Sequence, residues 1–211
     1  MTLLNEAEAQ QIANAIARIE QQTDAELVTV LAQQADEYTY IPALWAALAA
    51  LVAPGVVLFL PFWLDVAEVL LIQVIVFATL VLILRIPPVL RRIIPKTVKQ
   101  WRASNLARRM FLENNLHHTS GDTGLLIFVA ETERYVEIIA DRGISAKVDQ
   151  AQWQTIVDDF TAEVRAGKTV DGFLGAVEQC GQLLIEHVPA THDRDELPNH
   201  LILVSRKMLR L

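Results

Sequence analysis

Residues Thr123 to Ala140 read TGLLIFVA-ETER-YVEIIA, two apolar runs separated by four polar residues. The first run, 123–130, is apolar almost throughout, as expected of a strand that is buried on both faces of a sheet. The second run, 135–140, is rich in β-formers and follows a short polar turn at 131–134. Such spacing predicts an antiparallel hairpin at the centre of the fold.

Helices are predicted on both sides of this hairpin. Asp149 is a suitable N-cap for an amphipathic helix that Gly167 ends, and a second helix follows over 170–187 before Pro189. A further helix is predicted over 96–116.

The N-terminal segment supplies one more helix and one more strand. Asn5 and Glu8 have the spacing of a capping box for a helix over 5–22, and residues 25–32 (AELVTVLA) predict a strand. We expect strands 25–32 and 123–130 to lie side by side and parallel. The element order predicts the α/β class, as a layered sheet-and-helix domain.

Two long apolar runs interrupt this domain. Residues 41–64 are uncharged, and residues 66–86 contain 16 consecutive uncharged residues, 69–84. About 20 helical residues cross a bilayer core, so the runs predict a transmembrane helical hairpin inserted into the domain. The alternative, two buried helices of a large core, is disfavoured because the rest of the chain is too small to cover them. Aromatic residues mark one end (Tyr38, Tyr40, Trp45) and the other (Phe62, Trp63), as in interfacial belts.

The flanking charge predicts the orientation of the hairpin. Its connecting turn carries only Asp65, whereas the segment from Arg85 to Arg109 has no acidic residue. The positive-inside rule places this basic flank, both termini and the whole soluble domain in the cytoplasm. No cleavable signal peptide is expected, because the first 40 residues lack a basic region followed by an apolar one. The basic residues are Arg85, Arg91, Arg92, Lys96, Lys99, Arg102, Arg108 and Arg109.

Composition excludes several classes of function. The net charge of −7 disfavours nucleic-acid binding, and the single cysteine, Cys180, excludes an internal disulfide. No nucleophile elbow, phosphate-binding loop, dinucleotide fingerprint or zinc-protease motif is present.

Several segments together resemble the TPM-domain family, and in particular its bacterial YgcG-related membrane branch. They are IEQQTDAELVTVLAQ, the hairpin TGLLIFVA-ETER-YVEIIADRGI, and the later AEVRAGKTVDGFLGAVEQCGQLL and DRDELPN. The resemblance implies a TPM-like domain in two parts, 1–40 and 87–188, around the hairpin at 41–86, with a C-terminal tail at 189–211. It also implies residence in a bacterial inner membrane.

Five acidic residues are candidates for a metal site. Asp122, Glu131, Glu133 and Asp141 are expected near strand ends, and Glu26 begins the first strand. If they converge, they suit calcium or magnesium, which take several oxygen ligands; otherwise they are turn residues and solvated carboxylates. Arg134 and Arg142 are candidates for phosphate binding or for pairing with neighbouring acids.

Two functions follow from these observations. The first is a membrane-anchored interaction or accessory domain that binds the bilayer and a membrane or envelope protein, such as the LemA-type protein that the resemblance suggests. The alternative is a divalent-metal-dependent acid phosphatase, which the resemblance also implies. Against transfer of that activity, ETER stands at 131–134 where many members have an Asp-Asp-Arg turn. The tail segment Asp193–Asn199 is either a docking segment or a polar loop before the short apolar run 201–204.

Overall fold

A computed structural model describes residues 4–57, 59, 61, 64–119, 121–191 and 201–204. The chain divides into two compact units. One comprises residues 36–99, and the other combines residues 1–35 with residues 100–211.

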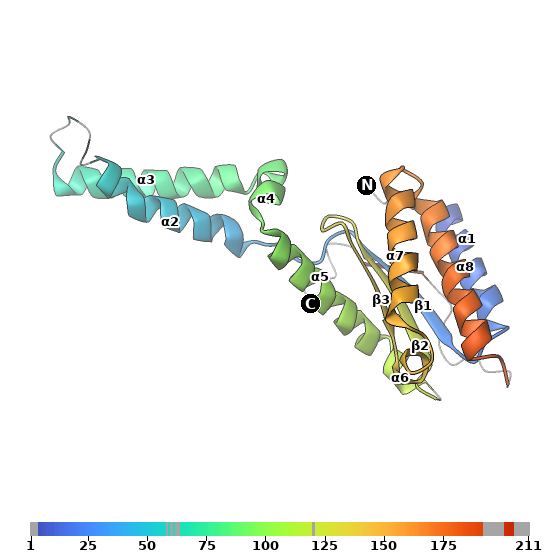
Figure 1. Ribbon diagram of the computed structural model, residues 1–211. Coiled ribbons are helices and arrows are strands. Elements are labelled where there is room, and N and C mark those ends of the chain that lie inside the picture. The colour runs from blue at the N-terminus through green and yellow to red at the C-terminus, as the bar shows by residue number, and fades with distance from the viewer. Residues whose placement is uncertain are drawn as a thin grey trace. The chain divides into compact units, whose positions relative to one another are not determined.

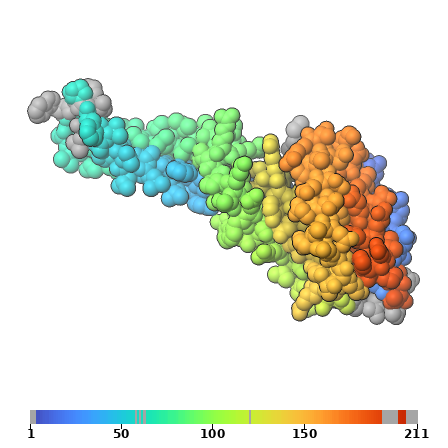
Figure 2. All heavy atoms as spheres, viewed as in Figure 1, coloured from blue at the N-terminus to red at the C-terminus, as the bar shows by residue number. Residues whose placement is uncertain are grey.

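Unit 36–99 is built from an antiparallel helical pair. Helix α2 spans Tyr40–Val57 and helix α3 spans Val66–Leu84, and the two lie side by side (Figures 1 and 2). Pro42, Ala46 and Ala50 recur every four residues on the buried face of α2. Small residues at this spacing allow helix backbones to approach closely. Asp65 and Glu68 form a capping box that starts α3.

The outer surface of this pair is apolar. None of the 19 residues of α3 is buried, and both helices are long and apolar enough to cross a membrane. Tyr40 and Trp45 are exposed as expected of interfacial aromatics, whereas Tyr38 is buried against Ile41 and Ile94. Helix α2 ends at Val57, earlier than the predicted Leu64, and Phe62 and Trp63 lie outside the described residues.

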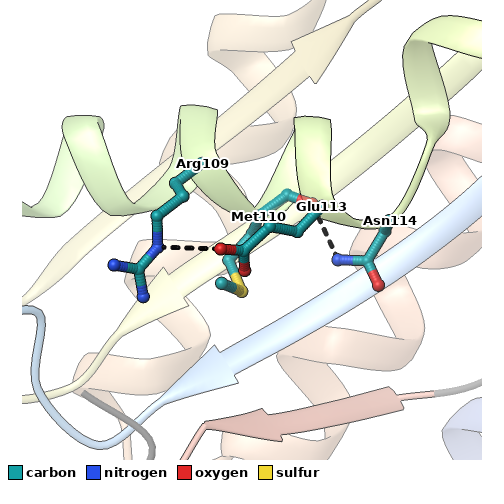
Figure 3. Close-up of polar contacts among 4 residues, drawn as sticks. All are labelled: Arg109, Met110, Glu113 and Asn114. Atoms are coloured by element: carbon teal, nitrogen blue, oxygen red, sulfur yellow. Dashed lines mark hydrogen bonds and ion pairs between the residues drawn. The ribbon is translucent and has the colours of Figure 1, made fainter. Parts of the chain in front are cut away.

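Pro87-Pro88 does more than end α3. It opens a short helix, α4 (Pro87–Ile93), because proline is well suited to the first turn of a helix. Helix α5 (Lys96–Glu113) follows and continues into the other unit. Its last turn is held by the amide of Asn114, which donates to the Met110 carbonyl at 2.7 Å, and by an Arg109–Glu113 ion pair at 3.3 Å (Figure 3).

The second unit contains a four-stranded mixed sheet in the order β3-β2-β1-β4. Strands β1 (Glu26–Ala32) and β2 (Gly124–Ala130) are parallel, as predicted, in a register that pairs Glu26 with Gly124. Strand β3 (Tyr135–Ala140) returns antiparallel to β2. Strand β4 (Leu201–Val204), which was not predicted, runs parallel to β1.

Helices cover both faces of this sheet (Figure 1). On one face lie α1 (Glu6–Glu20), α7 (Gln150–Arg165) and α8 (Thr169–His187). On the other face lies α5, through Ala103, Ala107 and Met110 among others. All residues of β1 and β2 are buried, which accounts for their nearly unbroken apolar sequence. The predicted layered α/β class is therefore confirmed.

Local signals fix the ends of these elements. Asn5 and Glu8 form the predicted capping box of α1, and Asp149 forms another with Gln152 at α7. Gly167, with a φ of +82°, ends α7. Two short helical turns, η1 (Leu116–His118) and α6 (Arg142–Ser145), flank the β2–β3 hairpin.

Candidate functional site

The sheet register separates the five carboxylates of the predicted metal site. Glu26, Asp122 and Asp141 lie at the end of the sheet where β1 and β2 begin. Glu131 and Glu133 follow β2, at the opposite end. A seven-residue strand is about 20 Å long, so the five do not form one ligand set. Among the described residues, no group of three or more acidic, histidine or cysteine side chains could hold a metal ion.

The first end of the sheet is a tightly bonded turn. The Asp141 side chain accepts from the Arg142 backbone N–H at 2.8 Å and caps α6. The Gly143 N–H donates to the Asp122 carbonyl at 2.9 Å. A Cβ atom at Gly143 would lie 2.2 Å from the Gly121 carbonyl oxygen, so only glycine fits this approach. Asp122 and Asp141 therefore act as turn and cap residues, and Glu26 is buried.

The second end is the turn between β2 and β3, and it is fixed to the chain that leaves β1. The Glu131 N–H donates to the Ala32 carbonyl at 3.0 Å, and the Thr132 N–H donates to the Gln33 carbonyl at 3.2 Å. The buried Glu133 carboxylate accepts from the Ala35 N–H at 3.0 Å. Arg134 adopts a left-handed backbone conformation (φ +53°) that turns the chain into β3. These bonds hold the turn in one conformation.

A pocket of about 450 Å³ lies beside this turn. We call it the turn pocket. Its walls come from the end of β2, the start of β3, the second half of α7 and the first residue of α8. Its volume is within the range of small-ligand sites, about 300–1,000 Å³. The lining includes Glu131, Arg134, Tyr135, Phe160, Val164 and Arg165.

Glu131 is the residue of the turn pocket whose pKa lies near neutral pH. Burial raises the pKa of its carboxyl from 4.5 to about 7, because a partly desolvated carboxylate is less stable than the neutral acid. A carboxyl with such a pKa exchanges a proton near neutral pH, as general acids and bases do. Burial also raises the pKa of Tyr135, which keeps its phenol neutral.

The two arginines of the turn pocket form no ion pair within the part of the chain that the structure describes. Arg134 and Arg165 are both exposed. Nearby, Lys168 pairs with Glu163 at 3.7 Å and does not line the pocket. Guanidinium groups bind carboxylates and phosphates through two parallel hydrogen bonds, so the pocket is suited to an anion.

The structure thus brings together two of the predicted site residues, Glu131 and Arg134. Arg142 lies on α6 at the other end of the sheet. Sequence reasoning missed Arg165 and Thr169, which also line the turn pocket. Their positions at the end of α7 and the start of α8 resemble ordinary helix termini, and no local sequence signal relates them to the β2–β3 turn.

Comparison with known proteins adds the family. Residues 92–183 match the family model of the TPM domain. Residues 92–183 are therefore similar to the TPM domain. The match to this TPM domain extends from the end of α4 into α8, and it leaves out α1 and the central strand β1.

A solved structure shares the fold of this chain. It is the NMR structure of BA42 protein from the psychrophilic bacterium Bizionia argentinensis, with 18% sequence identity and a TM-score of 0.58. The similarity covers 95% of this chain and 94% of that one. No curated protein matches the chain. The TPM relationship is therefore confirmed, and assignment to the YgcG-related branch stays a prediction.

Proposed function

We propose that this chain is a membrane-anchored TPM domain that binds a membrane or envelope protein at the bilayer surface. The observation that carries the proposal is helix α3, which is apolar on all sides and buries none of its residues within the protein. Nineteen helical residues span about 28 Å at 1.5 Å each, close to the thickness of a bilayer core. Lipid is the environment that covers such a surface.

The chain connection limits how far the TPM domain extends from this anchor. Only residues 33–39 separate β1 from α2. Seven extended residues reach about 25 Å at most. A partner that binds a domain on so short a connection must itself lie in the membrane or at its surface. The proposed partner is therefore a membrane or envelope protein, and a LemA-type protein is one candidate.

The orientation in this proposal comes from charge. The basic segment from Arg85 to Arg109 belongs in the cytoplasm, together with both termini, and the turn with Asp65 belongs on the opposite side of a bacterial inner membrane. An impermeant thiol reagent applied to intact cells tests this. Val66→Cys should react, and Ala151→Cys should react only after permeabilisation. Labelling of Ala151→Cys in intact cells would reverse the orientation.

Partner binding is tested by crosslinking in cells that produce the full chain, followed by purification of the adducts. The control is a chain whose α3 carries two central arginines and no longer forms the two-helix anchor. An adduct with a membrane or envelope protein should form with the natural chain and be lost in the control. The same adducts in both samples, or none above background with the natural chain, would contradict the proposal.

A second candidate is the divalent-metal-dependent phosphatase. One observation favours it: Glu131, with its pKa near 7, lies in one pocket with two arginines. Purified full-length protein should then hydrolyse p-nitrophenyl phosphate in the presence of calcium or magnesium, and Glu131→Gln should abolish turnover. Absence of turnover between pH 4 and 8 with either metal rejects this candidate.

A further inference from the structure

The turn pocket combines a positively charged side with an apolar wall. Arg134 and Arg165 supply the charge, and Phe160, Val164 and Val136 supply the wall. Phe160 is held in place by an edge-to-face contact with Phe173, at 5.0 Å between ring centroids. A molecule that fits the pocket therefore has an anionic group and an apolar group close to each other.

The count of charges in the turn pocket favours a single negative charge on that molecule. Among the residues that the structure describes, the charged ones that line the pocket are Glu131, Arg134 and Arg165. Once Glu131 is ionised, above its pKa of about 7, these three side chains carry a net charge of +1. A carboxylate balances this charge, whereas a phosphate monoester, which carries close to two negative charges above pH 7, would leave an excess.

The adjacent strand suggests the form of the molecule. Strand β3 occupies the outer position in the sheet order and pairs only with β2 among the described strands. Its first two residues, Tyr135 and Val136, line the turn pocket, and all six of its residues are partly exposed. An unpaired strand edge binds an extended peptide by adding it to the sheet.

We propose that the turn pocket binds the C-terminal end of an extended partner peptide. The terminal carboxylate lies between Arg134 and Arg165, the last side chain is apolar and packs against Phe160 and Val164, and the preceding residues pair with the edge of β3. The inference rests on the proposed function, because it names the part of the partner protein that the TPM domain recognises.

The test uses the full chain in detergent micelles and acetylated tetrapeptides that cover every pair of last two residues. Each peptide is prepared with a free carboxylate and with an amide. The tightest peptide should end in an apolar residue and bind at least tenfold more weakly as the amide. Arg134→Gln and Arg165→Gln should each weaken its binding at least tenfold, whereas the matched control Arg109→Gln, on α5, should change it less than twofold. Melting temperatures verify that the variants fold.

Three results would overturn the proposal. The first is that no peptide binds tenfold more tightly with a free carboxylate than as the amide. The second is that the two pocket variants bind the best peptide as tightly as the natural chain does. The third is that phenyl phosphate binds more tightly than the best peptide. Crosslinking in cells separates this failure from that of the proposed function. If Arg134→Gln/Arg165→Gln captures the same membrane partner as the natural chain, only the pocket assignment is wrong. If the natural chain captures no partner, the proposed function is wrong.

Discussion

The anchoring role of α3 can be tested by placing two positive charges at its centre. Val74 and Ile75 lie in the middle of the helix and are 63% and 54% exposed, so their replacement removes little packing within the protein. In water, Val74→Arg/Ile75→Arg would be harmless. In a bilayer core, both arginines would have to leave water.

The expected magnitude follows from the composition of the helix. Val66–Leu84 contains fourteen Leu, Ile, Phe and Val residues, each of which favours insertion by about 0.3–0.6 kcal/mol. Their sum is about 4–8 kcal/mol. Each arginine costs about 2.5–3.5 kcal/mol and also removes an apolar side chain, so the double variant loses about 6–8 kcal/mol. The helix should therefore no longer insert.

The assay combines carbonate extraction of membranes with protease accessibility of tags at both ends of the chain. The natural chain should resist extraction and carry both tags on one side of the membrane. In the double variant the tags should lie on opposite sides, or the chain should become extractable. The control Asn105→Arg/Leu112→Arg, at exposed positions of α5, should behave as the natural chain. A double variant that resists extraction with both tags on one side would refute the argument.

Three further predictions concern the unit that contains the sheet. Gly124→Ala should destabilise this unit by about 3 kcal/mol or more, because the new Cβ would lie 2.1 Å from the Leu116 carbonyl oxygen. Gly175→Ala should stabilise it by about 0.5–1 kcal/mol, because this position lies within α8 and has no atom within 4 Å of the new Cβ. Melting curves of the two variants should therefore shift in opposite directions, and a shift of both in one direction would contradict the packing described. Folding favours the protonated form of Glu131, because its pKa rises from 4.5 to about 7 in the folded chain, so stability should fall as the pH rises from about 4.5 to about 7. Glu131→Gln should remove this fall in stability. The measurement is urea unfolding of the natural chain and of Glu131→Gln between about pH 4.5 and about pH 7. If the stability of the two proteins changes with pH in the same way, Glu131 is not the source of the fall. Burial raises the pKa of the Cys180 thiol, so an aromatic disulfide reagent should label it only when the domain is unfolded, and rapid labelling of the folded chain would contradict its burial.

Elements with strong local signals were predictable from the sequence. Asn5 with Glu8 and Asp149 with Gln152 form capping boxes within four residues, so the starts of α1 and α7 follow from short-range chemistry. The unbroken apolar runs at 26–32 and 124–130 predicted two buried strands, and their parallel pairing is confirmed. Each of these signals lies within a single element.

Features that depend on contacts between distant segments were not predictable in the same way. Strand β4 has only four residues and is a strand because β1 offers it an edge. The turn pocket depends on how α7 packs over β3, so sequence spacing did not relate Arg165 to Arg134. The five acidic residues all lie at strand ends, as predicted, but the strand direction assigns them to opposite ends of the sheet.

The position of β1 in the sheet has a consequence for how the protein is made. Strand β1 is complete once residue 32 has been synthesised, yet its two neighbours come from residues 124–130 and 201–204. Both apolar helices, α2 and α3, are therefore synthesised before strand β2. Nearly all of the residues up to 204 are synthesised before strand β4 is complete. During that interval the seven residues of β1, all of them buried in the folded protein, lack both neighbouring strands, and unpaired strands of this kind are prone to aggregation.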